Sequence, residues 1–137
     1  MITAMSISIS GLNASAARLR ASASNVANAR TTGALPTNPV PAAAVPYAPV
    51  DVVQKSIGEG GGVAGVSATY VPRTPAYITV YDPADPSADA RGMVAAPNVD
   101  LAQEAVSQIE AAMSFRANLA ALKLEAQTTR ELLDVLA

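Results

Sequence analysis

Two residue clusters in this chain have a spacing that could support chemistry, and the first is glycine-rich. Gly60, Gly62 and Gly65 match the G-x-G-x-x-G pattern that binds dinucleotide phosphates. That pattern works between a strand and a helix, but here a β-rich stretch follows the glycines, and no P-loop lysine accompanies them. The glycines therefore predict a turn rather than a nucleotide site.

The second cluster consists of aspartates in one short stretch. Asp82, Asp85 and Asp89 offer carboxylates, which are the ligands that calcium prefers. Their spacing is not that of an EF-hand, and no downstream glutamate completes one. We expect a solvated loop here, and a solvated face for the acids near the C-terminus.

The composition removes most catalytic chemistry. The chain has no histidine and no cysteine, so it lacks the usual transition-metal ligands, thiol nucleophiles and Ser-His or Cys-His pairs. We therefore predict no enzyme activity, no catalytic residue, no cofactor and no metal. Only Arg18, Arg20 and Arg30 precede the first acid, Asp51, and three arginines without aromatic neighbours do not predict a nucleic-acid surface.

No apolar run approaches the roughly 20 residues that a membrane span requires. The start, MITAMSISISG, lacks the basic n-region of a secretory signal, so we expect no cleaved signal and no membrane insertion. An acid-free, serine-rich start with arginines is also typical of a mitochondrial transit peptide, which stays a minor alternative.

The N-terminal segment is amphipathic. Apolar residues recur at alternating spacings of three and four, as in a coiled-coil seam, at Ile2, Met5, Ile9, Leu12, Ala16, Leu19, Ala23 and Val26. The pattern predicts a helix over about 6–29 that depends on a partner, ended by a C-terminal glycine, Gly33. An ordinary amphipathic core helix fits the pattern almost as well.

A second long helix is predicted over 98–136. Asn98 or Asp100 can cap it, and Asp100 and Glu104 suit the positive end of its dipole. Its apolar face is wide enough to contact more than one helix, with the same spacing at Phe115, Leu119, Leu122, Leu133 and Leu136 and further apolar residues at Val106, Ile109 and Met113.

Between the helices the sequence predicts a mixed segment. Prolines make 34–49 an extended connector, either a plain linker or an arm that docks on a neighbour. Short strands are expected at 50–53, 63–71 and 77–81, in a hairpin or small sheet, and 82–97 is expected to be a loop.

The expected fold is therefore mainly α with a small β insert, in one structural unit. Its parts are an N-terminal helix (1–33), a Pro/Ala-rich connector (34–49), a β-rich insert and loop (50–97) and a C-terminal helix (98–137). The two long helices are expected to pair as an antiparallel coiled coil. The charged residues before Asp51 are all basic, and most of those after Asn98 are acidic. Attraction between these opposite charges would help to set the register of the two helices.

Several short motifs resemble those of the bacterial flagellar axial family, the rod and hook proteins. Residues 10–14 read SGLNA, 23–28 read ASNVAN and 31–33 read TTG; further on, YDPADPSAD (81–89), PNVD (97–100) and SFRAN (114–118) resemble the proximal rod proteins of that family. The motif residues are Ser10, Gly11, Leu12, Asn25, Asn28, Gly33, Tyr81, Asp82, Pro83, Pro97, Asn98, Val99, Asp100 and Asn118.

The resemblance implies a structural role in flagellum-dependent motility. It implies export by the flagellar type III apparatus without a cleaved signal, and a place in the periplasm-spanning rod of the basal body. It also implies that the terminal helices polymerise with other copies and with other rod proteins into the drive shaft that transmits motor torque to the hook. No small-molecule substrate is implied.

We expect the helix and subunit contacts to be made by the two apolar seams, that is, by Ile2, Met5, Ile9, Leu12, Leu19, Val26, Val106, Ile109, Met113, Phe115, Leu119, Leu122, Leu133 and Leu136. Ile9, Leu12, Leu19 and Val26 are expected to face the C-terminal helix, and Asn25 and Asn28 are candidates for polar contacts between subunits. Two alternatives stay open: another axial component, such as a different rod or hook-junction protein, and a small non-flagellar helical-hairpin binding module.

Overall fold

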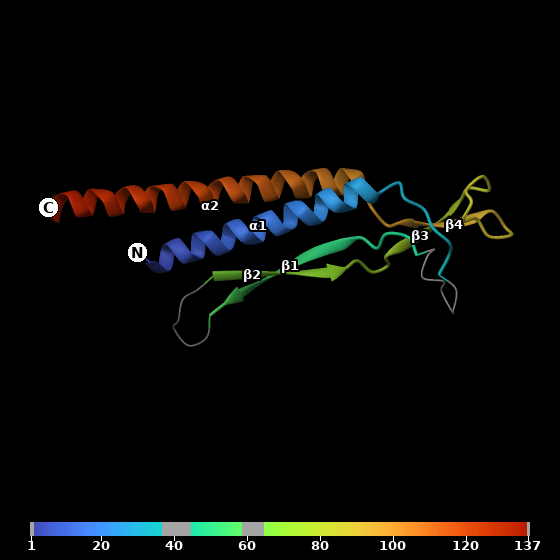
Figure 1. Cartoon of the computed structure of the whole chain (residues 1–137), viewed down its shortest axis with the longest axis horizontal. Coiled ribbons are helices and arrows are strands. Elements are labelled where there is room, and N and C mark those ends of the chain that lie inside the picture. The colour runs from blue at the N-terminus through green and yellow to red at the C-terminus, as the bar shows by residue number, and fades with distance from the viewer. Residues whose placement is uncertain (1, 37–44, 59–64, 137) are drawn as a thin grey trace. The chain divides into compact units, whose positions relative to one another are not determined.

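The computed structural model describes residues 2–36, 45–58 and 65–136, with side chains from Ala4 onward. Two long helices, α1 (Ile2–Asn28) and α2 (Leu101–Leu136), enclose four strands in the sequence: β1 (Val50–Ile57), β2 (Gly65–Pro72), β3 (Tyr77–Tyr81) and β4 (Met93–Pro97) (Figure 1). The prediction of a mainly α fold with a small β insert is confirmed. The glycine turn at Gly60 and Gly62 and residues 37–44 of the connector lie outside the described residues.

Helix α1 begins earlier and ends earlier than predicted. It starts at Ile2 and ends at Asn28, where the amide of Thr31 donates to the carbonyl of Asn28 at 3.0 Å. Gly33 is therefore not the helix cap, and that prediction is wrong. Gly33 instead exchanges two backbone hydrogen bonds with Ala95, at 2.9 and 3.0 Å, in an isolated bridge to β4.

Asp100 caps helix α2, which confirms one of the two predicted capping residues. Its carboxylate accepts hydrogen bonds from the amides of Ala102 (2.8 Å) and Gln103 (3.2 Å), which have no partner within the helix. Asn98 lies outside the helix, and its amide donates to the carbonyl of Ala76 at 2.9 Å.

The strands form two separate two-stranded sheets, β1–β2 and β3–β4, rather than one sheet. In the second sheet the strands are antiparallel, with Tyr77 opposite Pro97 and Tyr81 opposite Met93. The prediction that 82–97 is entirely a loop is wrong for β4. Its sequence, MVAAP, has weak strand propensity, and the strand forms because it is buried, with Val94 and Ala95 fully enclosed.

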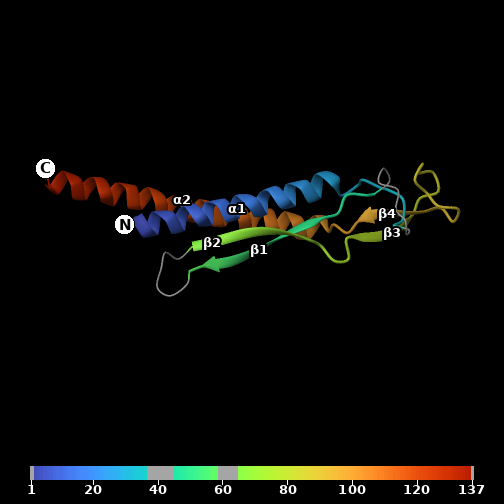
Figure 2. The same cartoon turned by 60° about the horizontal axis from the view of Figure 1, so that its bottom comes forward.

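The described chain divides into two compact units, and each takes pieces from both ends of the sequence. The first contains residues 1–20, 52–69 and 106–137, and the second contains 21–51 and 70–105. In the first unit α1 packs against α2 on one side and against the β1–β2 sheet on another (Figures 1 and 2). Within the described ranges neither helix carries an apolar stretch long enough to cross a membrane.

Candidate functional site

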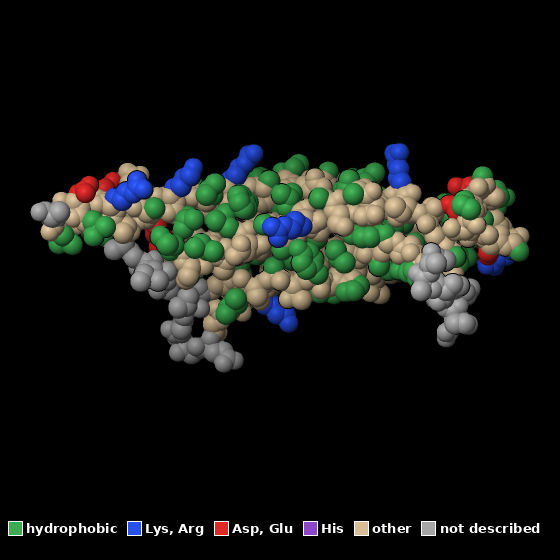
Figure 3. Space-filling model, viewed as in Figure 1, with side chains coloured by type: hydrophobic (Ala, Val, Ile, Leu, Met, Phe, Trp, Pro, Cys, Tyr) green, Lys and Arg blue, Asp and Glu red, His purple; other side chains and the backbone are tan. Residues whose placement is uncertain are grey.

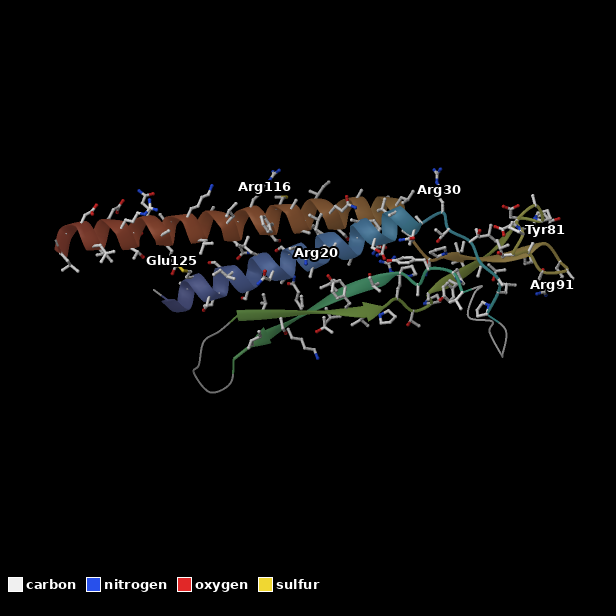
Figure 4. All side chains as sticks on the ribbon, in the orientation of Figure 1. Arg20, Arg30, Tyr81, Arg91, Arg116 and Glu125 are labelled. Carbon is white, nitrogen blue, oxygen red and sulfur yellow. The ribbon has the colours of Figure 1, made fainter. Side chains whose placement is uncertain are left out.

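The contact between α1 and α2 in the first unit is made by small and polar side chains. Ser8 and Ser15 of α1 are buried, as is Ala111 of α2. Gly11 lies against Asn118, and Ala4 and Ser8 share a groove with Ala121 and Glu125, so the two helices run antiparallel. Glu125 lies on the side of α2 that faces α1 (Figure 4).

This contact line is offset by one residue from both predicted apolar seams. Ser8, Gly11 and Ser15 each come one position before the seam residues Ile9, Leu12 and Ala16; Ala111, Ser114 and Asn118 stand in the same relation to Ala112, Phe115 and Leu119. One residue turns a helix by about 100°, so the apolar seams lie to the side of the contact.

The apolar seams are consequently left partly open. In α1, Ile9 is 44% exposed and Leu19 is 41% exposed; in α2, Ile109 and Met113 exceed 60%. Met5, Val26, Val106, Phe115, Leu133 and Leu136 are also exposed, and Leu12, Leu119 and Leu122 are half-buried. A small-residue line occupies the contact with α2, and the expectation that Ile9 faces α2 stays a prediction. Contacts of these side chains with other subunits stay a prediction.

The SGL motif lies at a close contact between α1 and α2. A Cβ atom built on Gly11 would lie 2.5 Å from Asn118 Oδ1, so this glycine permits the close approach of α2. The Ser10 hydroxyl donates to the carbonyl of Ile7 at 2.7 Å and accepts from the amide of Val66 at 3.1 Å. Ser10 therefore fastens the start of β2 to α1.

The second unit is organised around Asn25, which is 1% exposed. Its amide nitrogen donates to the carbonyl of Val50 and to Glu104 Oε1, both at 2.9 Å, and its oxygen accepts from the amide of Val50 at 3.0 Å. The Tyr47 hydroxyl lies 3.0 Å from the same oxygen. Asn25 thus joins α1 to the end of the connector, to β1 and to α2, and its contact with other subunits stays a prediction.

Glu104 is buried at 3% exposure and shares its carboxylate between Asn25 and Arg73. Arg73 Nη2 lies 2.8 Å from Glu104 Oε1 and 2.6 Å from Asp51 Oδ1. The hydrogen bond to Asp51 raises the pKa of Arg73 above its usual range, Glu104 adds to this, and partial burial opposes it. The guanidinium also donates to the carbonyl of Asn98 at 3.0 Å. Charge compensation of this kind makes a buried carboxylate tolerable.

The remaining motif residues shape the β3–β4 connection, where Figure 4 places Tyr81 and Arg91. Gly92 has a φ of 75°, and a Cβ there would lie 2.9 Å from the Tyr81 ring and 3.0 Å from Pro83. Glycine is therefore required by both conformation and space. Pro97 is buried, and the Asn98 side chain donates to the carbonyl of Pro75 at 3.0 Å.

The three aspartates of this loop accept hydrogen bonds from protein donors. Asp85 accepts from the Thr32 hydroxyl and from the amide of Ser87, and these bonds lower its pKa. Asp89 accepts from the amides of Met93 and Arg91, which lower its pKa in the same way. Over 2–36, 45–58 and 65–136, no three His, Cys, Asp or Glu side chains are grouped as metal ligands would be.

Sequence reasoning missed the small-residue line and the Asn25–Glu104–Arg73 network. A signal for the first was available, because Ser8, Ser15 and Ser22 recur every seven residues. The second had no such signal, since Arg73 lies between two strands and far along the chain from Asn25.

These features define a structural protein whose terminal helices pair through small residues and leave apolar seams exposed. No family model matches the sequence. The chain is 34% identical to the flagellar basal-body rod protein FlgC of Agrobacterium fabrum, over 97% of this chain and 93% of that protein. It is 34% identical to the FlgC of Bacillus subtilis, over 86% of both chains, and 32% identical to that of Aquifex aeolicus, over 90% of this chain and 88% of that protein.

The chain therefore belongs to the FlgC family of flagellar basal-body rod proteins, and it is a structural subunit of the basal-body rod.

Proposed function

We propose that this chain polymerises through its terminal helices in the proximal rod and that it transmits torque there without any catalytic role. The observation that carries the proposal is the offset between the contact line and the apolar seams. Because α1 and α2 meet through small residues, Leu19, Ile109 and Met113 stay exposed on helices that are otherwise paired. Exposed apolar surface of this extent is typical of protein interfaces.

The position of these side chains favours contacts with several neighbours. Hydrophobic side chains are numerous over the helix pair, with Lys and Arg side chains along its upper edge and another in the middle of this face (Figure 3). Further helices that pack alongside the pair would cover the exposed seam residues of both helices. Repeated head-to-tail contacts that do not close into a ring produce a helical assembly.

The partners we propose are other copies of this chain, other rod proteins and, before assembly, the flagellar type III export apparatus. The first two follow from the open apolar seams and from the rod-protein names of the relatives. Export apparatus recognition rests on the family resemblance alone.

Localisation and a double substitution test this proposal. A tag inserted at residue 61 should be found in the rod of purified hook–basal bodies by mass spectrometry and gold labelling. Leu12→Asp with Leu19→Asp should abolish assembly and motility while leaving synthesis intact, because two carboxylates would lie in the seam that neighbouring subunits are proposed to cover. Asn13→Asp with Ala27→Asp is the matched control, since both side chains are exposed on α1.

Motility of the Leu12/Leu19 variant at the level of the control would refute polymerisation through this seam. Absence of the tagged protein from basal bodies of motile cells would refute the rod assignment itself and favour a different helical-hairpin protein.

A further inference from the structure

The C-terminal end of α2 carries apolar side chains that are largely exposed, namely Leu132, Leu133, Val135 and Leu136. The groove that α1 shares with α2 is lined by Ala4 and Ser8 of α1 and by Ala121, Glu125 and Thr128 of α2. Beyond it α2 continues to Leu136, past the first turn of α1, in both views of the ribbon (Figures 1 and 2). We call residues 130–136 the overhang.

In the overhang, the residue types at the α1-facing positions of α2 change. Continuing from Glu125 at helical spacing, the α1-facing positions are Thr129, Leu132 and Leu136. Small and polar residues thus give way to leucines where α1 ends. Leu133 is 61% exposed and Leu136 is 84% exposed. A leucine face at this position is suited to a helix from another chain.

The charge of the overhang indicates the surroundings it requires. It contains Glu131 and Asp134 against Arg130, and the last turn of α2 holds no basic residue. The C-terminus of a helix carries a partial negative charge, so Asp134 adds to an uncompensated dipole. Cations supplied by another surface would stabilise this end.

A matching surface exists on the same helix pair. Ala16, Leu19, Ala112 and Phe115 line a shallow apolar groove of about 250 Å³, and Arg20 and Arg116 flank it. Figure 4 shows the two arginines on α1 and α2 at a similar level along the pair, with Arg116 directed away from α1. Leu19 and Phe115 are each about 40% exposed, so the apolar floor is accessible. We call these six residues the arginine groove.

We infer that the overhang of one copy docks into the arginine groove of a second copy. Leu132, Leu133 and Leu136 would cover Leu19 and Phe115, while Arg20 and Arg116 would offset Asp134 and the helix dipole. The contact joins different surfaces of the two copies, so it is head-to-tail and can repeat. This inference rests on the proposed polymerisation and specifies one of its contacts.

The natural absence of cysteine allows a direct test with purified full-length chain. Val135→Cys in one tagged copy and Ala16→Cys in another place thiols on the overhang and in the arginine groove without removing a leucine. Under mild oxidation we expect at least tenfold more mixed disulfide dimer than from Val135→Cys with Met113→Cys. Met113 is more exposed than Ala16, so random encounters would favour that control.

Charge reversal tests the same contact in a second way. Arg20→Glu with Arg116→Glu should reduce the Val135–Ala16 crosslink about tenfold, and Glu131→Lys with Asp134→Lys in the other copy should restore it. Arg30→Glu with Lys123→Glu changes the net charge equally outside the groove and should leave the crosslink intact. Circular dichroism of each variant establishes that its helices are kept.

Equal crosslinking of the Ala16 and Met113 pairs, or no rescue by the paired charge reversal, would overturn the inference. Crosslinking of Val135→Cys in isolated basal bodies to a different rod protein, and not to a second copy, would also overturn it. Both failures are compatible with wild-type protein in the rod, so they are distinguishable from failure of the proposed function.

Discussion

The side-chain amide of Asn25 donates to the Glu104 carboxylate at 2.9 Å, and both residues are almost fully buried. This bond joins the end of α1 to the start of α2, 79 residues apart in the sequence. The same asparagine pairs with both backbone groups of Val50. One motif residue thus holds three segments of the second unit together.

Asn25→Ala should therefore destabilise the chain by about 2–4 kcal/mol, because it leaves the Val50 groups and the Glu104 carboxylate with fewer partners in a buried site. Urea unfolding of the purified chain measures the change. Asn28→Ala is the matched control: Asn28 donates only to the carbonyl of Ser24 one turn earlier, so its loss should cost about 1 kcal/mol or less. Equal effects of the two substitutions would contradict the role assigned to Asn25.

Gly11→Ala should have opposite effects in two backgrounds. Alanine favours a helix by about 1 kcal/mol over glycine, but a Cβ at Gly11 would meet Asn118 Oδ1 at 2.5 Å and force that side chain away from the Ser114 carbonyl. We expect destabilisation in the natural chain and stabilisation when Asn118→Ala is also present, with a coupling energy of about 1–2 kcal/mol. A double-mutant cycle on thermal unfolding measures it, and simple additivity would exclude the close contact.

Ala111→Leu should destabilise the first unit by about 1–3 kcal/mol, since the residue is 1% exposed in the small-residue contact of α2. Ala117→Leu introduces the same side chain at an exposed position of the same helix and should change stability little. Chemical denaturation of both variants provides the comparison. If Ala111→Leu were as stable as Ala117→Leu, the helices would not meet along this line.

The β3–β4 connection should loosen in acid. Hydrogen bonds from Thr32 and Ser87 to Asp85, and from Met93 and Arg91 to Asp89, lower both pKa values below the ordinary 3.8. Their stabilising effect is complete above the unfolded value and is lost as the pH falls below it through the folded value. Near neutral pH, protonation of Asp85 and Asp89 should not affect the hydrogen exchange of the Arg91 and Met93 amides. Below about pH 3.8 this exchange should accelerate. Asp89→Asn should remove most of that acid dependence.

The sequence was sufficient for the features that depend on local pattern and local chemistry. Alternating spacings of three and four placed both long helices, and Asp100 capped the second because an aspartate before a helical run satisfies free amides. Strands rich in β-branched residues were placed approximately. β4 was missed because its residues have no strong strand preference and its burial depends on partners such as Gly33 and β3.

The sequence by itself determined that this chain is two amphipathic helices around a β insert, with motifs of the flagellar axial family. Only the tertiary structure decided which face of each helix is used internally. Apolar periodicity indicates that a face will be buried, but it does not say by which chain. Gly11, Ser15 and Ala111 allow the backbones to approach closely, so they form the internal contact and leave Leu19 and Met113 exposed. Likewise, Asn25 joins Glu104 because only the antiparallel pairing of the helices brings the two side chains together.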